Sequence, residues 1–123
     1  PRSKGGLGEM KIPLLADVSK QIASDYQCLL DDGVSTRATY IIDNTGKLRY
    51  ALQQDRPIGR NVDDCLRTVQ ALQFFDKYGE VCPANWNPGS KTMKADPYGK
   101  LEYFEAVNAP ENTEDATQAK QNE

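Results

Sequence analysis

A repeat of apolar residues near the middle of the chain limits the fold more than any other feature. Apolar side chains recur at helical spacing at Val62, Leu66, Val69, Leu72 and Phe75. Asn61 with Asp64 three residues later resembles a capping box, and Gly79 follows the last turn. The pattern predicts a helix over residues 62–78 with one apolar face.

Residues 39–52 are typical of a β-hairpin. Residues 39–42 are β-branched or aromatic, which favours a strand. The polar residues 43–46 end in glycine and indicate a turn, and residues 48–52 return as a second strand.

The first third of the chain predicts a strand followed by a helix. Residues 12–15 form a short apolar run that predicts a buried strand, although Pro13 removes one backbone donor. Asp17 or Ser19 can cap the helix that follows, and Gly33 can end it. The side chains at helical spacing in this segment are Val18, Ile22, Tyr26 and Leu29 or Leu30.

The predicted order is strand, helix, strand, strand, helix, followed by an arm and a tail. This is an α/β pattern that resembles the C-terminal half of a thioredoxin-like fold plus a C-terminal arm. We expect a partial thioredoxin-like domain over 1–79, an arm with a short helix over 80–107, and a disordered polar tail over 108–123. Three strands alone leave an unpaired edge, and the first residue is proline. We therefore expect upstream sequence to be absent.

The composition excludes several kinds of site. With a net charge of −3 and no histidine, the chain disfavours a nucleic-acid partner and cannot use Ser-His or Cys-His catalysis. The cysteines are Cys28, Cys65 and Cys82, and none forms a C-x-x-C pair, so an ordinary zinc site is not expected. An odd count suits a reactive or intermolecular thiol. Three reduced, buried cysteines are the alternative.

A set of short motifs resembles the typical 2-Cys peroxiredoxins. Residues 79–86 read Gly-Glu-Val-Cys-Pro-Ala-Asn-Trp, and Pro-Gly then Thr-Met-Lys follow, as in the family's resolving-cysteine segment. Residues 58–63 resemble its vGRsvDE stretch. The match runs from residue 1 to about residue 107. Its GGLG and YF motifs are matched by Gly5, Gly6, Leu7, Gly8, Tyr103 and Phe104.

The resemblance implies a role for Cys82. In this family a peroxidatic cysteine attacks peroxide and becomes a sulfenic acid, and the resolving cysteine of the partner subunit condenses with it to a disulfide. Cys82 lies on a segment rich in proline and glycine, which suits a thiol that must reach another chain. An incidental loop thiol is the alternative. Cys28 and Cys65 fall on or beside predicted helices, where packed structural thiols are expected.

The resemblance also implies roles for two arginines and for the short motifs. Arg37 resembles the arginine that binds the peroxide and stabilises the attacking thiolate. Arg60 resembles a supporting arginine that braces the site through a carboxylate. The alternative for Arg37 is an ordinary surface arginine at a strand edge. The alternative for Arg60 is an ion pair at the start of the following helix. The GGLG and YF motifs imply a regulatory contact that slows disulfide formation.

The chain departs from the family pattern at several positions. Asn85 stands where glycine is frequent, and Arg56 and Cys65 are unusual at their places. The peroxidatic cysteine of the family follows a threonine by three residues, but the corresponding residues here are Asp25, Val62 and Gly79. We therefore expect the attacking thiol to precede Pro1 and the 123 residues alone to be inactive.

Two functions remain open at this point. The first is a thiol-dependent peroxidase for hydrogen peroxide and organic hydroperoxides, working as a homodimer that can form a decamer. It would use a thioredoxin-like reductant, need no metal or organic cofactor, and have no nucleic-acid or membrane partner. The cytoplasm is the default compartment, since a targeting segment would lie upstream. The alternative is a non-catalytic thioredoxin-like binding or chaperone module, if the natural chain starts near Pro1.

Overall fold

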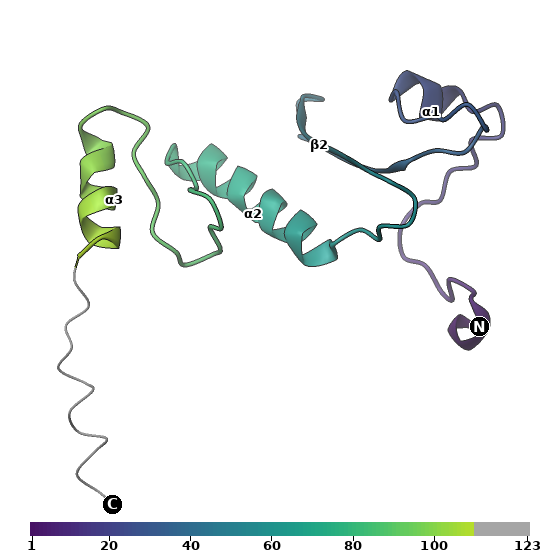
Figure 1. The fold of residues 1–123 in the computed structure, drawn as a ribbon, viewed down its shortest axis with the longest axis horizontal. Helices are drawn as coiled ribbons and strands as arrows, with labels where there is room; N and C mark the ends of the chain where they lie inside the picture. Colours follow the sequence, from purple (N-terminus) through teal and green to yellow (C-terminus); the bar gives the residue numbers. More distant parts are fainter. Residues whose placement is uncertain (110–123) are drawn as a thin grey trace, which may run out of the picture. The chain divides into compact units, whose positions relative to one another are not determined.

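The computed structural model describes residues 1–109, which divide into two compact units (Figure 1). The first unit runs from Pro1 to Arg60, and the second begins at Asn61. The first contains a 3-10 helix (Arg2–Lys4), α1 (Gln21–Asp25), β1 (Arg37–Ile42) and β2 (Leu48–Gln54). The second contains α2 (Val62–Tyr78) and α3 (Gly99–Val107). The predicted domain boundary at residue 79 stays a prediction.

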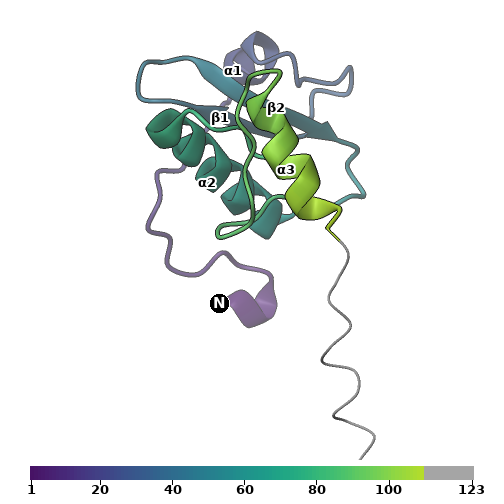
Figure 2. The same cartoon turned by 90° about the vertical axis from the view of Figure 1, so that its left-hand side faces the viewer.

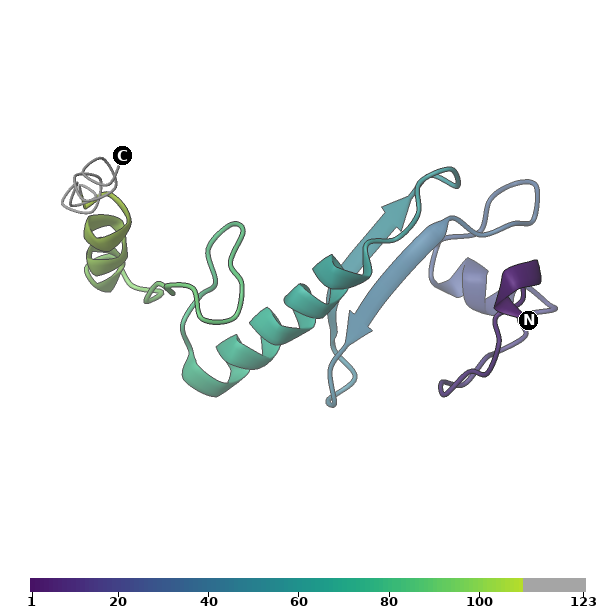
Figure 3. The same cartoon turned by 90° about the horizontal axis from the view of Figure 1, so that it is seen from below.

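Strands β1 and β2 form the predicted antiparallel hairpin (Figure 3). Its ends are the pairs Arg37 with Gln54 and Ile42 with Leu48, with an irregularity in the register between Ile41 and Ile42. The turn is closed by Asp43, whose carboxylate accepts hydrogen bonds from Thr45, from the Lys47 N–H and from Arg49. These bonds, the one from the Thr45 hydroxyl first, hold the pKa of Asp43 well below its ordinary value.

The predicted strand at residues 12–15 is wrong. The segment is irregular, and Ile12, Leu14 and Leu15 are 62%, 62% and 81% exposed. An apolar run is buried only where another element packs against it, and within the described residues none pairs with this segment. The described part of the chain therefore has two strands in its sheet.

The helix expected to follow is much shorter than predicted. Helix α1 has five residues, and Val18 is 89% exposed rather than part of a buried face. The backbone adopts positive φ at Lys20 and at Gln27, so the chain turns on both sides of this short helix. The predicted capping role of Asp17 is confirmed, because its carboxylate accepts from the backbone N–H groups of Ile22 and Ala23.

Helix α2 matches the predicted helix at both ends. The side chain of Asn61 accepts from the Asp64 N–H at 3.0 Å, which caps the first turn. Gly79 has a φ of 71° and its N–H donates to the carbonyl of Phe75, which ends the helix.

The core of the second unit is built around Trp86, which is 3% exposed. Its ring lies 5.4 Å from that of Phe74 on α2. A backbone bridge between Val81 and Met93 closes the loop that carries Trp86. Asn85, in this loop, adopts the left-handed conformation that asparagine tolerates better than most residues.

Helix α3 confirms the short helix predicted within the arm over residues 80–107. Asp96 accepts hydrogen bonds from the N–H groups of Tyr98 and Gly99 and so caps its start. Figure 2 shows the segment before α3 running beside that helix, where Lys91 donates to the Ala106 carbonyl and Lys94 pairs with Glu102.

Two predictions concern features outside these elements. Residues 110–123 of the predicted disordered tail lie outside the described residues. Among residues 1–109, no helix combines the length and the apolar character needed to cross a membrane.

Candidate functional site

Cys82 lies in the loop that follows α2, directly after the bridge residue Val81. The residue is half-buried, and its thiol donates a hydrogen bond to the carbonyl oxygen of Ala71 at 3.7 Å. Burial raises the pKa of the Cys82 thiol above its ordinary value, and the positive charge of Arg67 offsets this only in part. The side chain is therefore protonated at neutral pH in this arrangement.

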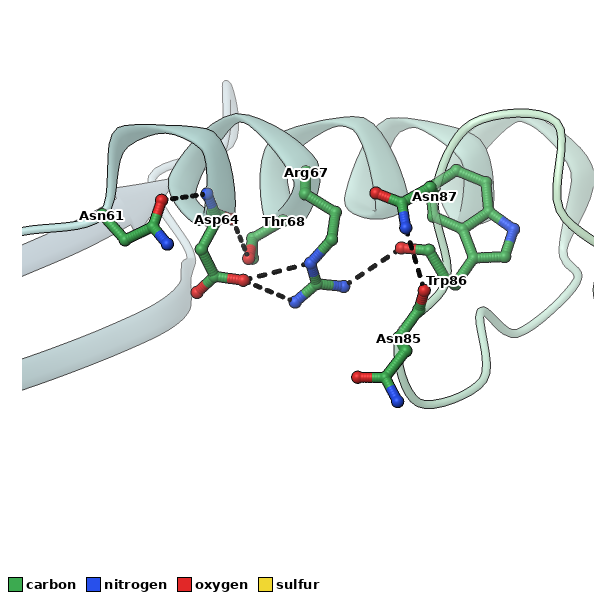
Figure 4. Close-up of polar contacts among 7 residues, drawn as sticks. All are labelled: Asn61, Asp64, Arg67, Thr68, Asn85, Trp86 and Asn87. Atoms are coloured by element: carbon green, nitrogen blue, oxygen red, sulfur yellow. Dashed lines mark hydrogen bonds and ion pairs between the residues drawn. The ribbon is translucent and has the colours of Figure 1, made fainter.

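Arg67 connects α2 to the loop of Cys82 (Figure 4). Its Nε and Nη2 both donate to the same carboxylate oxygen of Asp64, Oδ1, at 3.0 and 2.9 Å. A third N–H donates to the carbonyl oxygen of Trp86 at 3.4 Å. Since Asp64 is also part of the cap of α2, this chain of bonds ties the loop to the first turns of the helix.

The indole of Trp86 is the second attachment of the loop. Besides its contact with Phe74, its Nε1–H donates to the carbonyl of Ser90 at 3.3 Å. The ring thus packs on the helix and also bonds the returning side of its own loop. Cys82 lies between the bridge at Val81 and this anchored ring, so its exposure depends on both.

The structure brings Arg37 and Arg60 to the same end of the hairpin in the first unit. Arg37 begins β1, and its Nε donates to the carbonyl of Arg56. The Nε of Arg60 donates to the carbonyl of Ala38 at 3.2 Å. This bond attaches Arg60 to the strand backbone, and its expected bracing of the site through a carboxylate stays a prediction.

A hollow of about 400 Å³ lies beside Arg60 in the first unit. Arg60, Cys28 and Tyr40 contribute to its wall. Cys28 is 8% exposed and its thiol donates to the carbonyl of Ala23 at 3.4 Å, which agrees with the expected packed thiol. Cys65 is half-buried in the first turns of α2.

The two short motifs predicted to have a regulatory role lie in different units. Gly5 and Gly8 adopt positive φ, and the Leu7 carbonyl accepts a hydrogen bond from Arg2. The rings of Tyr103 and Phe104 meet edge-to-face with centroids 5.6 Å apart on α3. A contact between the two motifs stays a prediction, as do the roles of Cys82, Arg37 and Arg60.

Several residues of the site were missed by sequence reasoning. The i,i+3 spacing of Asp64 and Arg67 is a signal for their ion pair, but nothing local shows that Arg67 reaches the Trp86 carbonyl. The pairing of Arg56 with Asp32, at 2.7 Å, joins residues too far apart in sequence for any local signal.

The chemistry of these groups limits what the site can do. The second unit carries a protonated thiol on a closed loop, and the first unit separately carries two arginines, whose guanidinium N–H groups can bind a small polar or anionic group. Among residues 1–109, no cluster of three or more His, Cys, Asp or Glu side chains could hold a metal ion. The described residues thus form a mixed α/β protein that carries a half-buried cysteine on the loop after α2.

Comparison with known proteins identifies the family. Residues 3–51 match the AhpC/TSA family, and residues 71–106 match the C-terminal domain of 1-Cys peroxiredoxin. The chain is 56% identical over 108 residues to a thioredoxin peroxidase of Trypanosoma brucei rhodesiense, covering 87% of this chain and 54% of that protein. It is 54% identical over 109 residues to peroxiredoxin-4 of Bos taurus, covering 88% of this chain and 40% of that protein.

A solved structure agrees with these relatives. The reduced 2-Cys peroxiredoxin of Plasmodium vivax superposes with a TM-score of 0.81 at 45% identity, over 85% of this chain and 54% of that one. The chain belongs to the peroxiredoxin family, and its fold is the C-terminal part of that family's thioredoxin-like fold. It spans 54% and 40% of the length of the two curated relatives named above.

Proposed function

We propose that this chain works in a thiol-dependent peroxidase that reduces hydrogen peroxide and organic hydroperoxides. Cys82 is its resolving cysteine, and the attacking cysteine is none of the three cysteines in these 123 residues. The observation that carries the proposal is the setting of Cys82, a half-buried thiol on a loop that a backbone bridge closes and that Arg67 and Trp86 attach to α2. Membership of the peroxiredoxin family supports it.

The proposed step at Cys82 is a condensation. The attacking cysteine of a second subunit, oxidised to a sulfenic acid, carries an S–OH group. The sulfur of Cys82 attacks that sulfur, the S–O bond breaks, and the hydroxyl leaves with the thiol proton as water. The product is an intersubunit disulfide, which a thioredoxin-type dithiol then reduces by exchange. The raised pKa of Cys82 keeps it protonated until the loop opens, so the thiolate forms only once the sulfur leaves its burial site.

Arg37 has a matching role in the proposal. Its Nε is occupied by the carbonyl of Arg56, which leaves the two terminal amino groups, with four N–H donors, for a substrate. A fixed guanidinium can donate to both oxygens of a peroxide and stabilise the negative charge that develops on the leaving oxygen. We propose Arg60 as its neighbour that fixes the adjoining strand backbone.

The assembly belongs to the proposal as well. An intersubunit disulfide requires at least a dimer. We also propose that the dimers form a decamer and that the protein is located in the cytoplasm. The names of the relatives, a thioredoxin peroxidase and a reduced 2-Cys peroxiredoxin, support the reductant and the two-cysteine chemistry.

The experiment uses the protein as its gene encodes it, with Cys82→Ser compared with Cys65→Ser. The intact mass is measured with and without reductant, and turnover of hydrogen peroxide is measured with thioredoxin as donor. We expect Cys82→Ser to abolish the reductant-sensitive dimer and to lower turnover by about 100-fold or more, because the sulfenic acid is no longer resolved. Cys65→Ser should keep both.

Two results would overturn the proposal. One is a Cys82→Ser protein that still forms the reductant-sensitive dimer and turns over normally. The other is a wild-type protein of 13.7 kDa that stays monomeric without reductant and consumes no peroxide. That second result would favour the non-catalytic binding module.

A further inference from the structure

The side chain of Arg37 is held from outside the hairpin that carries it. Its Nε donates to the carbonyl oxygen of Arg56, which follows the end of β2 at Gln54. Since Arg37 pairs with Gln54 in the sheet, the bond links the first residue of β1 to the segment just beyond β2. A bond through Nε fixes the plane of the whole guanidinium, because that group is rigid.

The carbonyl that accepts this bond belongs to an exposed turn. The Ile58 N–H donates to the Asp55 carbonyl at 3.0 Å, and the Arg56 N–H donates to the Asp55 side chain at 2.7 Å. Both bonds are local, so they shape the turn without attaching it to the rest of the unit. A turn of this kind moves easily unless something distant holds it.

The distant attachment is an ion pair made by the side chain of Arg56. Its Nη1 lies 2.7 Å from the Asp32 carboxylate, 24 residues away in sequence. Asp32 is itself fixed, since its carboxylate accepts from the Val34 N–H at 3.1 Å in a turn closed by Leu30 and Val34. The bond from Val34, and after it the bond from Arg56, lower the pKa of Asp32, so the carboxylate is ionised at neutral pH.

We propose that Asp32 and Arg56 are positioning residues for Arg37. The ion pair holds the Arg56 turn against the Asp32 turn, and the Arg56 carbonyl then fixes the guanidinium that meets the peroxide. Arg56 acts twice in this arrangement. Its side chain pairs with Asp32, and its backbone carbonyl accepts the hydrogen bond from Arg37. The inference rests on the proposed function, since it takes Arg37 as the residue that binds peroxide.

The expected effect is moderate. The side chains of Arg56 and Asp32 are 50% and 48% exposed, so solvent screens their attraction and their contribution to stability is small. Their effect on the reaction is one of geometry, because a misplaced donor loses much of its stabilisation of the transition state. We expect losses of about threefold to tenfold in the peroxide step, against about 100-fold for removal of the Arg37 guanidinium.

The test compares Asp32→Asn and Arg56→Met with Asp31→Asn in the protein as its gene encodes it. Arg56→Met removes the anchor and leaves the carbonyl in the chain. Asp31→Asn is the matched control, because it changes the same charge at the neighbouring position and its side chain makes no hydrogen bond or ion pair within residues 1–109. Arg56→Lys keeps the charge and should retain most of the wild-type rate.

Two rate constants separate positioning from a general loss of structure. The rate constant for oxidation by hydrogen peroxide is measured by competition with a second peroxidase at limiting peroxide. The rate constant for disulfide formation, which does not depend on peroxide concentration, is measured by quenched flow. We expect Asp32→Asn and Arg56→Met to slow the first by about threefold to tenfold and to leave the second unchanged. The double variant should be no slower than the slower single variant, because both changes break one pair.

The outcomes distinguish this inference from the proposed function. If Arg37→Gln slows the peroxide step while Asp32→Asn and Arg56→Met match Asp31→Asn, only the inference is overturned. If Arg37→Gln leaves the peroxide step unchanged, the proposed role of Arg37 is overturned and the inference with it. If Asp32→Asn and Arg56→Met slow disulfide formation as much as they slow the peroxide step, the inference is also overturned. A positioning role for Arg37 acts on the peroxide step alone.

Discussion

Cys28 and Cys82 make the same bond in two different settings. Each follows a helix, and each thiol donates to a backbone carbonyl, that of Ala23 for Cys28 and that of Ala71 for Cys82. The backbone of Cys28 is also paired, since its N–H donates to the Ala23 carbonyl and its own carbonyl accepts from the Thr36 N–H. Cys82 instead directly follows Val81, the residue at which the backbone bridge to Met93 ends and the loop begins.

The difference lies in what must move before each sulfur meets solvent. Exposing Cys28 means breaking the backbone bonds that join α1 to the start of the hairpin. Exposing Cys82 means breaking its own bond to the Ala71 carbonyl and opening a loop held by the Val81 bridge, the Trp86 ring and the Arg67 guanidinium. A thiol that has to reach a second protein is better served by the second arrangement, because local opening of a loop costs less than unfolding a unit.

Removing the indole should have the largest effect on this comparison. We expect Trp86→Ala to destabilise the second unit by about 3 kcal/mol, because it empties the position of a fully packed ring. Alkylation of Cys82, followed by mass spectrometry, should become about tenfold faster or more, while that of Cys28 is unchanged. Trp86→Phe is the control, and it should lose much less stability and accelerate the alkylation of Cys82 much less. Equal acceleration at both cysteines would show that the two settings are not independent.

A change at the end of α2 should have a smaller effect. Gly79 has a positive φ with open space where a Cβ would lie, so Gly79→Ala costs backbone strain alone, about 1 kcal/mol. Gly46→Ala in the hairpin turn is the matched control, because Gly46 also has a positive φ and open space where a Cβ would lie. We expect Gly79→Ala, and not Gly46→Ala, to raise the alkylation rate of Cys82. If both variants act alike on Cys82, the loop is not tied to the end of α2.

The charge of Arg67 should have the smallest effect. Arg67 lowers the pKa of Cys82 against the effect of burial, so Arg67→Met should raise that pKa further and reduce the thiolate present at a given pH. The midpoint of the pH profile of alkylation should move upward for Cys82. The plateau at high pH reports access to the sulfur and is expected to rise, since the bond to the Trp86 carbonyl is lost. Arg67→Lys should keep the midpoint near that of the wild type.

Elements with local signals were predicted well from sequence. Helix α2 begins at the predicted cap at Asn61 and ends at the predicted glycine, although Val62 and Leu66 of its apolar repeat are exposed. The hairpin likewise has its signal in the turn, where Asp43 closes the loop through residues within six positions. In both cases the residues that decide the conformation lie close together in the sequence.

Elements that need a distant partner were predicted poorly. The apolar run at residues 12–15 has the composition of a buried strand, but burial depends on what packs against it. The helix predicted after it failed for a related reason, since a short helix is marginal without a packed face. The ion pair of Asp32 with Arg56 was missed because it joins two turns that only the fold brings together.

The distribution of aromatic residues gives the second unit a built-in optical signal. Trp86 is the single tryptophan of these 123 residues, and it lies in the loop that carries Cys82. Its buried ring should emit at short wavelength, and release of the loop should shift that emission to the red as water reaches the indole. Tryptophan emission from these 123 residues, excited where tyrosine does not absorb, therefore reports on a single loop, and opening at Cys82 can be followed in real time without a dye.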